Sequence, residues 1–142
     1  MNIQKVISQL NKRYPGKQII ENRNMNGDVV EIICKIDPTE KHPTHSLAVA
    51  VVDQSVLQFH RKLTETYKVL KGKLIVFMTD RNVRLKKGGQ LTIEPGEVHA
   101  TFGEETWLTV YSEPGWTLKD HIGLKPIIKR YLVTINRQAL GS

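Results

Sequence analysis

Cysteine is almost absent from this chain, and its scarcity limits both the chemistry and the surroundings of the protein. The single cysteine, Cys34, excludes an intramolecular disulfide, which fits a reducing compartment. Cys34 lies in an apolar run and is predicted to be a buried strand residue rather than a nucleophile. No apolar stretch approaches the roughly 20 residues that a transmembrane helix needs, and the amino terminus lacks the character of a signal peptide. We therefore expect a cytoplasmic protein with no membrane partner.

Aromatic residues are also scarce, at 6% of the chain, and this bears on the meaning of its charge. The formal net charge is +7, but the basic residues are spread along the sequence. No series of aromatic side chains for stacking on bases accompanies them, and no recognition-helix pattern is present. We therefore expect no nucleic-acid partner. The basic balance indicates a solvated basic surface, or a field that attracts anionic small molecules.

Internal repeats and low-complexity segments are missing as well, and 142 residues fit one domain. Asn2 to Tyr14 carries apolar side chains at helical spacing, with Asn2 as the N-cap and Pro15-Gly16 as the stop. From Lys17 onward, short apolar runs alternate with turn signals. About eight or more short strands of this kind predict an all-β sandwich or barrel.

The first of two chemically informative stretches runs from Gln58 to Gly72. Side chains alternate between the two faces of a strand, so Gln58 and His60 are predicted to share one face. Glu65 and Tyr67 share a face of the next strand. His60 and Glu65 can therefore face each other across two adjacent strands.

The second stretch runs from Gly88 to Gly103 and adds another histidine, His99. We expect a turn at Pro95-Gly96, a strand from Val98 to Phe102, and another turn at Glu104-Glu105 before the next strand. Two imidazoles and a carboxylate from neighbouring strands form a set that leaves positions open on Fe(II). The same ligands accept Mn, Ni, Co or Zn, so the identity of the metal is open. The Gln58 carbonyl oxygen is a candidate weak fourth ligand.

These two stretches resemble the paired motifs of the cupin family, G-x5-H-x-H-x3,4-E-x6-G and G-x5-P-x-G-x2-H-x3-N. The resemblance covers about residues 45 to 112. The residues that match are His60, Glu65, Gly72, Gly88, Gly96 and His99. The sequence departs from the motifs at Val52 (for the opening Gly), Gln58 (for the first His), Glu94 (for the Pro) and Gly103 (for the Asn).

The resemblance implies an all-β fold, a double-stranded β-helix or jelly roll, to which the helical spacing of the first residues adds an N-terminal amphipathic helix. We expect one cupin domain over residues 1–142, divided into a helix (1–16), a barrel (17–115) and a C-terminal extension (116–142). The resemblance also implies a divalent metal held by His60, Glu65 and His99, with Gln58 in the place of the missing histidine. It further implies a small-molecule ligand and a homodimer.

Three functions remain open from the sequence. The first is a metal-dependent isomerase or epimerase that acts on a small oxygenated, anionic molecule such as a sugar or sugar phosphate. Tyr67, Glu94 and Tyr111 are the candidate catalytic residues for this reaction. The second is an Fe-dependent dioxygenase, which binds O₂ at the open metal positions. The third is a non-catalytic binding protein, which the replacement of a histidine by Gln58 favours.

The remaining histidines carry weaker signals. His42 and His45 flank a polar loop that contains two prolines. They are predicted to be ordinary loop residues, with a substrate contact at the barrel mouth as the alternative. His121 follows Asp120, and the sequence indicates no partner for it. Further on, Ile127 to Val133 is predicted to add a short helix or an edge strand.

Overall fold

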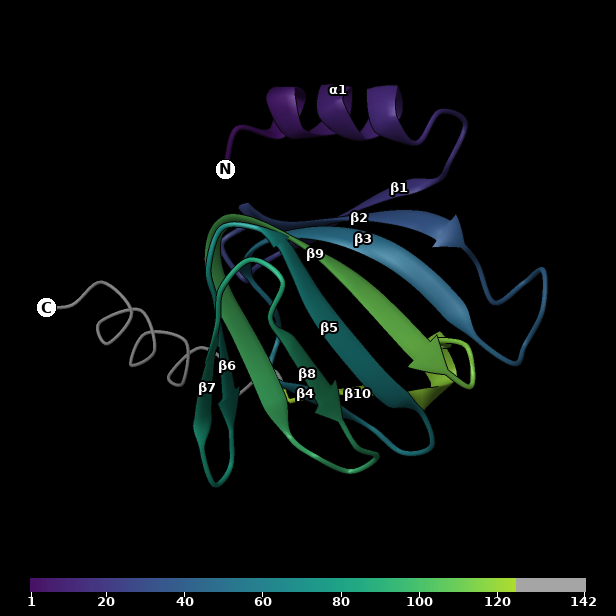
Figure 1. The fold of residues 1–142 in the computed structure, drawn as a ribbon, viewed down its shortest axis with the longest axis vertical. Coiled ribbons are helices and arrows are strands. Elements are labelled where there is room, and N and C mark those ends of the chain that lie inside the picture. The colour runs from purple at the N-terminus through teal and green to yellow at the C-terminus, as the bar shows by residue number, and fades with distance from the viewer. Residues whose placement is uncertain (125–142) are drawn as a thin grey trace, which may run out of the picture.

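A computed structural model describes residues 1–124, so the element expected at Ile127 to Val133 lies outside the described residues. Within residues 1–124 the chain forms one α-helix, ten strands and a short 3-10 turn (Figure 1). Their bounds are α1 (Ile3–Arg13), β1 (Ile19–Arg23), β2 (Val29–Asp37), β3 (Ser46–Gln54), β4 (Gln58–His60), β5 (Thr64–Lys71), β6 (Leu74–Met78), β7 (Asn82–Leu85), β8 (Gln90–Ile93), β9 (His99–Glu113), η1 (Leu118–Asp120) and β10 (His121–Gly123).

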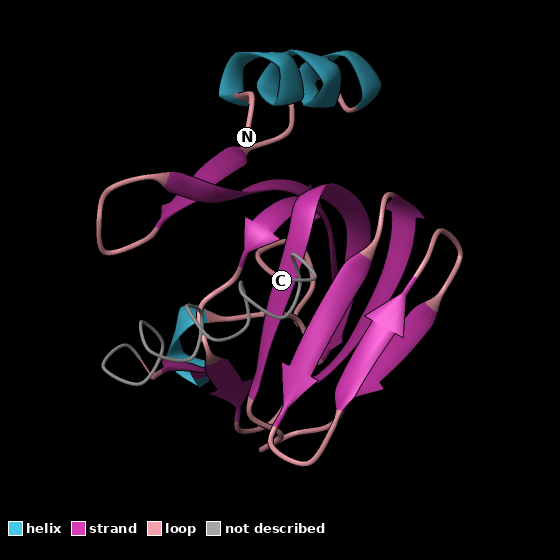
Figure 2. Ribbon diagram, turned by 90° about the vertical axis from the view of Figure 1, so that its left-hand side faces the viewer, coloured by secondary structure: helices cyan, strands magenta, loops and turns pink. Residues whose placement is uncertain are grey.

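The strands form one antiparallel sheet that curls on itself, with β9 at its centre (Figures 1 and 2). The first part of β9 pairs with β6, where His99 lies opposite Met78. Its second part runs between β3 and β5, where Val110 lies opposite Ala48 on one side and Tyr67 on the other. Because β9 pairs with four other strands along its length, its curvature is shared by the whole sheet. The fold is therefore mostly β, as predicted.

The prediction of a turn at Glu104-Glu105 is wrong, because β9 continues through these residues. Glu105 has φ of +47°, and the pairing registers of β9 shift nearby against both β3 and β5. Irregularities of this kind bend a strand without ending it. A Cβ at Gly103 would lie 2.5 Å from the Thr106 Oγ1 atom. Close packing at this bend explains a glycine at the position where the family motif has Asn.

Helix α1 covers the outer face of the sheet (Figure 2). Asn2 caps it, as predicted, by accepting a hydrogen bond from the Lys5 backbone N–H at 3.2 Å. The apolar stripe of the helix, with Val6 and Leu10 fully buried, packs against a cluster that includes Cys34 and Trp107. Burial of Cys34 confirms the prediction for this residue. No helix within residues 1–124 has both the length and the apolar content to cross a membrane.

The inner face of the curled sheet holds a separate apolar cluster. Its buried members are Ala50, Val52, Tyr67, Val69, Leu74, Val76, Met78, Leu85, Ile93 and Leu108. A third cluster, with Leu57, Phe77, Ala100 and Phe102, packs beside it. The polar side chains of β4, β5 and β9 lie at the margin of this packed interior, where they face one another rather than water.

Candidate metal centre

The structure brings His60, Glu65 and His99 together inside the curl of the sheet. The Nε2 atom of His99 lies 3.3 Å from Glu65 Oε1, and Nε2 of His60 lies 3.5 Å from Glu65 Oε2. The three ligand atoms all lie within 4.8 Å of one another. Each residue is at most 3% exposed. One carboxylate thus faces two imidazoles in a buried cluster, and the three residues meet as the paired motifs predict.

Three separate chain segments position these side chains. His60 ends β4, and the turn after it is held by Asp120, whose carboxylate accepts hydrogen bonds from the backbone N–H groups of Lys62 and Leu63. Glu65 lies in β5, which pairs with β9. His99 opens β9 and lies directly opposite Gln58 in the β4–β9 pairing.

The electrostatics of the site favour the charge states that bind a metal. Burial alone would raise the pKa of Glu65, but the neighbouring His99 and His60 and a hydrogen bond from Tyr67 lower it below its usual range. Burial lowers the pKa of His60, which keeps its imidazole neutral. Metals bind the ionised carboxylate and the neutral imidazole, so a metal ion would take over from the imidazole protons the role of balancing the Glu65 charge.

The unpaired ring nitrogens are consistent with a divalent cation between these residues. Nδ1 of His99 lies 2.9 Å from the Glu97 carbonyl oxygen. A carbonyl only accepts, so Nδ1 donates, and in a neutral ring Nε2 then points a lone pair at the Glu65 carboxylate. Nε2 of His60 and of His99 have no hydrogen-bond partner among residues 1–124. A buried lone pair facing a carboxylate is unfavourable, and either a proton on Nε2 or a metal ion between the two groups removes the conflict.

Tyr67 belongs to this centre. Its hydroxyl donates a hydrogen bond of 2.7 Å to Glu65 Oε1, and both side chains are buried. Burial, and then the adjacent Glu65 carboxylate, raise the pKa of Tyr67 well above its usual range. The residue is therefore a permanent hydrogen-bond donor that orients the carboxylate.

The other two candidate catalytic residues, Glu94 and Tyr111, lie outside the pocket. Glu94 is exposed and accepts a hydrogen bond of 3.4 Å from the Thr64 hydroxyl. The Tyr111 hydroxyl donates to the Glu113 carboxylate. Neither Glu94 nor Tyr111 lines the cavity beside the metal ligands.

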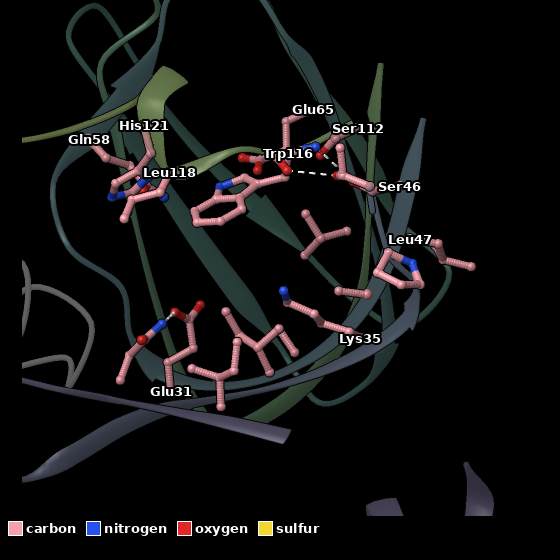
Figure 3. A pocket seen from close by; sticks show the side chains of 18 of the residues that line it. Glu31, Lys35, Ser46, Leu47, Gln58, Glu65, Ser112, Trp116, Leu118 and His121 are labelled. Atoms are coloured by element: carbon pink, nitrogen blue, oxygen red, sulfur yellow. Dashed lines mark hydrogen bonds between the residues drawn. The ribbon is translucent and has the colours of Figure 1, made fainter. Parts of the chain in front are cut away.

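That cavity has a volume of about 310 Å³ and lies on the inner face of the sheet (Figure 3). Glu65 and Tyr67 line it, and Glu31 enters from the side opposite Glu65, on β2. Trp116 projects into the space between them. The volume is near the lower limit for small-molecule sites. It therefore suits a ligand of the size of a monosaccharide or a nucleoside.

Two titratable residues that line the pocket, His121 and Glu31, have no site role in the sequence-based predictions. His121 pairs with His60 in the β10–β4 ladder, with ring centroids 5.4 Å apart, and it lines the cavity. Burial, and then His60, lower the pKa of His121. Its strand has three residues, too few for a period-two pattern to be seen. Glu31 had a detectable signal, because alternation in β2 places it on the face opposite Ile32 and Cys34.

Comparison with protein-family models and with curated proteins gives no match to the sequence. Solved structures do match. Streptomyces Pac13, a nucleoside dehydratase whose variants have been solved with uridine, has a TM-score of 0.66 at 13% identity, over 79% of this chain and 88% of that chain. Oxalate decarboxylase from Bacillus subtilis has a TM-score of 0.65 at 11% identity, over 78% of this chain and 31% of that chain.

Ectoine synthase from P. lautus has a TM-score of 0.53 at 12% identity, over 62% of this chain and 67% of that chain. The chain has a cupin fold. The expectation from the two motifs is confirmed at the level of the fold. Cupin-fold neighbours include enzymes with different small-molecule reactions, so the fold by itself does not select one of them.

Proposed function

We propose that this cupin is a metal-dependent enzyme that moves a proton on a small polyhydroxylated molecule, in a reaction of the isomerase or epimerase type. One observation carries the proposal. Glu65, which belongs to a buried set of metal-type ligands, lines the same cavity as Glu31, a second carboxyl group on the opposite wall. Pac13, whose fold is similar, is a dehydratase that has been solved with uridine, a ligand of comparable size.

His60, Glu65 and His99 would hold the metal, with Gln58 beside them. The chemistry that a divalent ion supplies when bound at such a site is polarisation of carbonyl and hydroxyl oxygens. Tyr67 keeps the Glu65 carboxylate in place through its hydrogen bond. Burial of these side chains strengthens each of these electrostatic interactions.

Glu31 is the proposed acid–base residue. Burial raises the pKa of Glu31 to about 7, although a hydrogen bond of 2.8 Å from the Asn22 amide opposes the shift. Within residues 1–124, no lysine or arginine forms an ion pair with Glu31, because Lys35 pairs with Glu40 and Arg23 pairs with Glu21. A carboxyl group that titrates near neutral pH can both accept and return a proton.

The charges on the pocket wall favour an uncharged substrate over a phosphorylated one. The cationic residues that line the cavity are Arg23 and Lys35, and the acidic ones are Glu31, Asp37, Glu40 and Glu65. Both cations are already in ion pairs with carboxylates. The positive net charge of the chain therefore does not extend into the pocket, and we narrow the proposed substrate from sugars and sugar phosphates to neutral sugars.

An exchange experiment in D₂O tests this function. The protein is stripped of metal, reloaded with Mn²⁺, Fe²⁺ or Zn²⁺, and incubated anaerobically with a panel of aldoses, ketoses, nucleosides and their phosphates. We expect metal-dependent deuterium incorporation at a carbon next to a carbonyl, detected by NMR, with neutral substrates preferred. Glu31→Gln should abolish this exchange and leave metal content unchanged.

Two other outcomes would overturn the proposal. Oxygen consumption that requires Fe²⁺ would assign the chain to the dioxygenases. Saturable binding of a panel member, without exchange or product under any metal, would make it a binding protein.

A further inference from the structure

A second group of metal-type ligands lies outside the centre described above, in the connection between β2 and β3. Asp37 ends β2, and His42 and His45 follow it in the loop. Nε2 of His42 lies 2.7 Å from Asp37 Oδ1, and Nε2 of His45 lies 3.6 Å from Asp37 Oδ2. As in the first centre, the ligand atoms all lie within 4.8 Å of one another.

We propose that Asp37, His42 and His45 form a second metal site, which binds a divalent transition-metal ion such as Zn²⁺ or Ni²⁺. Two imidazoles and one carboxylate are a ligand set that these ions accept. Mg²⁺ and Ca²⁺ prefer oxygen ligands and are not expected to bind. Because it shares no residue with the first centre, this site does not depend on the proposed enzymatic function.

The orientation of the two rings supports this assignment. The imidazoles of His42 and His45 stack with centroids 4.1 Å apart and planes inclined by 30°, so both present Nε2 to the same carboxylate. Nδ1 of His45 lies 3.1 Å from the Thr44 hydroxyl, which holds that ring in place. Both rings and the carboxylate can therefore bind a single divalent ion together.

The loop that carries these ligands is anchored to the pocket. The Thr39 hydroxyl donates a hydrogen bond of 2.7 Å to the Trp116 carbonyl oxygen, and the Gly115 N–H donates to the Pro43 carbonyl at 2.9 Å. Asp37 and Thr39 both line the cavity. A metal ion in this loop would therefore fix one end of the pocket wall, and with it the position of Trp116.

The two sites differ in exposure, which predicts different affinities. The side chains of Asp37, His42 and His45 are 37%, 33% and 40% exposed, against 5% or less for the three ligands of the first centre. Exposed ligands are hydrated again when the ion leaves, so release of the ion costs less free energy than it does at a buried site. The loop site should therefore bind the ion more weakly and exchange it faster.

Metal stoichiometry on the full chain tests the proposal. Metal-free protein is titrated with Zn²⁺ in competition with a chromogenic chelator, and the Zn²⁺ bound per chain is determined at equilibrium from the absorbance of the chelator. We expect about two ions per chain for the wild type and about one for the His42→Ala/His45→Ala variant, with the weaker site lost. Lys41→Ala, an exposed change in the same loop, is the matched control and should retain both ions.

A His60→Ala/His99→Ala variant separates the two sites. It should keep about one ion, in the weaker class, whether or not the first centre supports catalysis. Circular dichroism of every variant checks that it is folded. If His42→Ala/His45→Ala binds as many Zn²⁺ ions as the wild type, or if folded His60→Ala/His99→Ala binds none, the loop site does not exist.

Discussion

The hydroxyl of Tyr67 donates to Oε1 of Glu65, the same oxygen that faces Nε2 of His99. Tyr67 and Glu65 lie two residues apart on β5, so their side chains point to the same face of the sheet. The donor that orients the carboxylate is thus supplied by the strand that carries the carboxylate itself. This local arrangement makes the metal centre sensitive to a change that removes no ligand.

Tyr67→Phe should weaken metal binding by about 10-fold or more, because loss of an outer hydrogen bond to a ligand has an effect of this size. The affinity is measured by chelator competition. Tyr111→Phe is the matched control, since the Tyr111 hydroxyl bonds to Glu113 away from the cavity. Equal affinities for the two variants would show that Tyr67 does not position the metal ligand.

Removal of a histidine ligand should weaken metal binding more than removal of the neighbouring Gln58 side chain. We expect His60→Ala and His99→Ala each to lose the buried metal, because each change deletes a strong donor. Gln58→Ala should weaken binding less, since an amide oxygen is at most a weak ligand. Metal analysis of the purified variants is the measurement, and equal metal content in all three would contradict the assignment.

The pH dependence of stability provides a test of Glu31 that needs no substrate. In the folded, metal-free protein the pKa of Glu31 is about 7, against 4.5 for an ordinary glutamate. The folded state therefore holds this proton more tightly than the unfolded state. The resulting stabilisation is complete below pH 4.5 and is lost as the pH rises through about 7.

Wild type should therefore lose stability relative to Glu31→Gln over this interval, by about 1 kcal/mol per pH unit. Urea denaturation at several pH values, with a chelator present, measures the difference. Glu31→Gln keeps the shape of the side chain and removes the charge, so it controls for packing. Parallel stability curves for the two proteins would rule out a raised pKa of Glu31.

The contact between helix α1 and the sheet should contribute substantially to stability. Leu10 is fully buried there, so Leu10→Ala should lower the free energy of unfolding by about 3 kcal/mol through lost burial and a residual cavity. The exposed Lys12→Ala change on the same helix should have little effect. Urea denaturation compares the two, and a similar loss in both would show that the helix does not depend on its apolar stripe.

Much of the fold was predictable because strand and helix patterns are local. Helical spacing and the Asn2 cap predicted α1, and spacing between motif residues predicted that His60, Glu65 and His99 would meet. Prediction was wrong at Glu104-Glu105, where a polar pair reads as a turn but lies at an irregularity inside a continuous strand. A bend of this kind depends on close packing, here of Gly103 against Thr106, which no local pattern records.

The alternation of polar and apolar side chains along each strand determined which residues share a face, because that period is a property of the extended backbone. Only the tertiary structure decided which faces meet. Pairing of β10 with β4 places His121 beside His60, and the curl of the sheet places Glu31 across the cavity from Glu65. Such pairings join segments far apart in the chain, and they form because burial is optimised over the whole sheet rather than within any single strand.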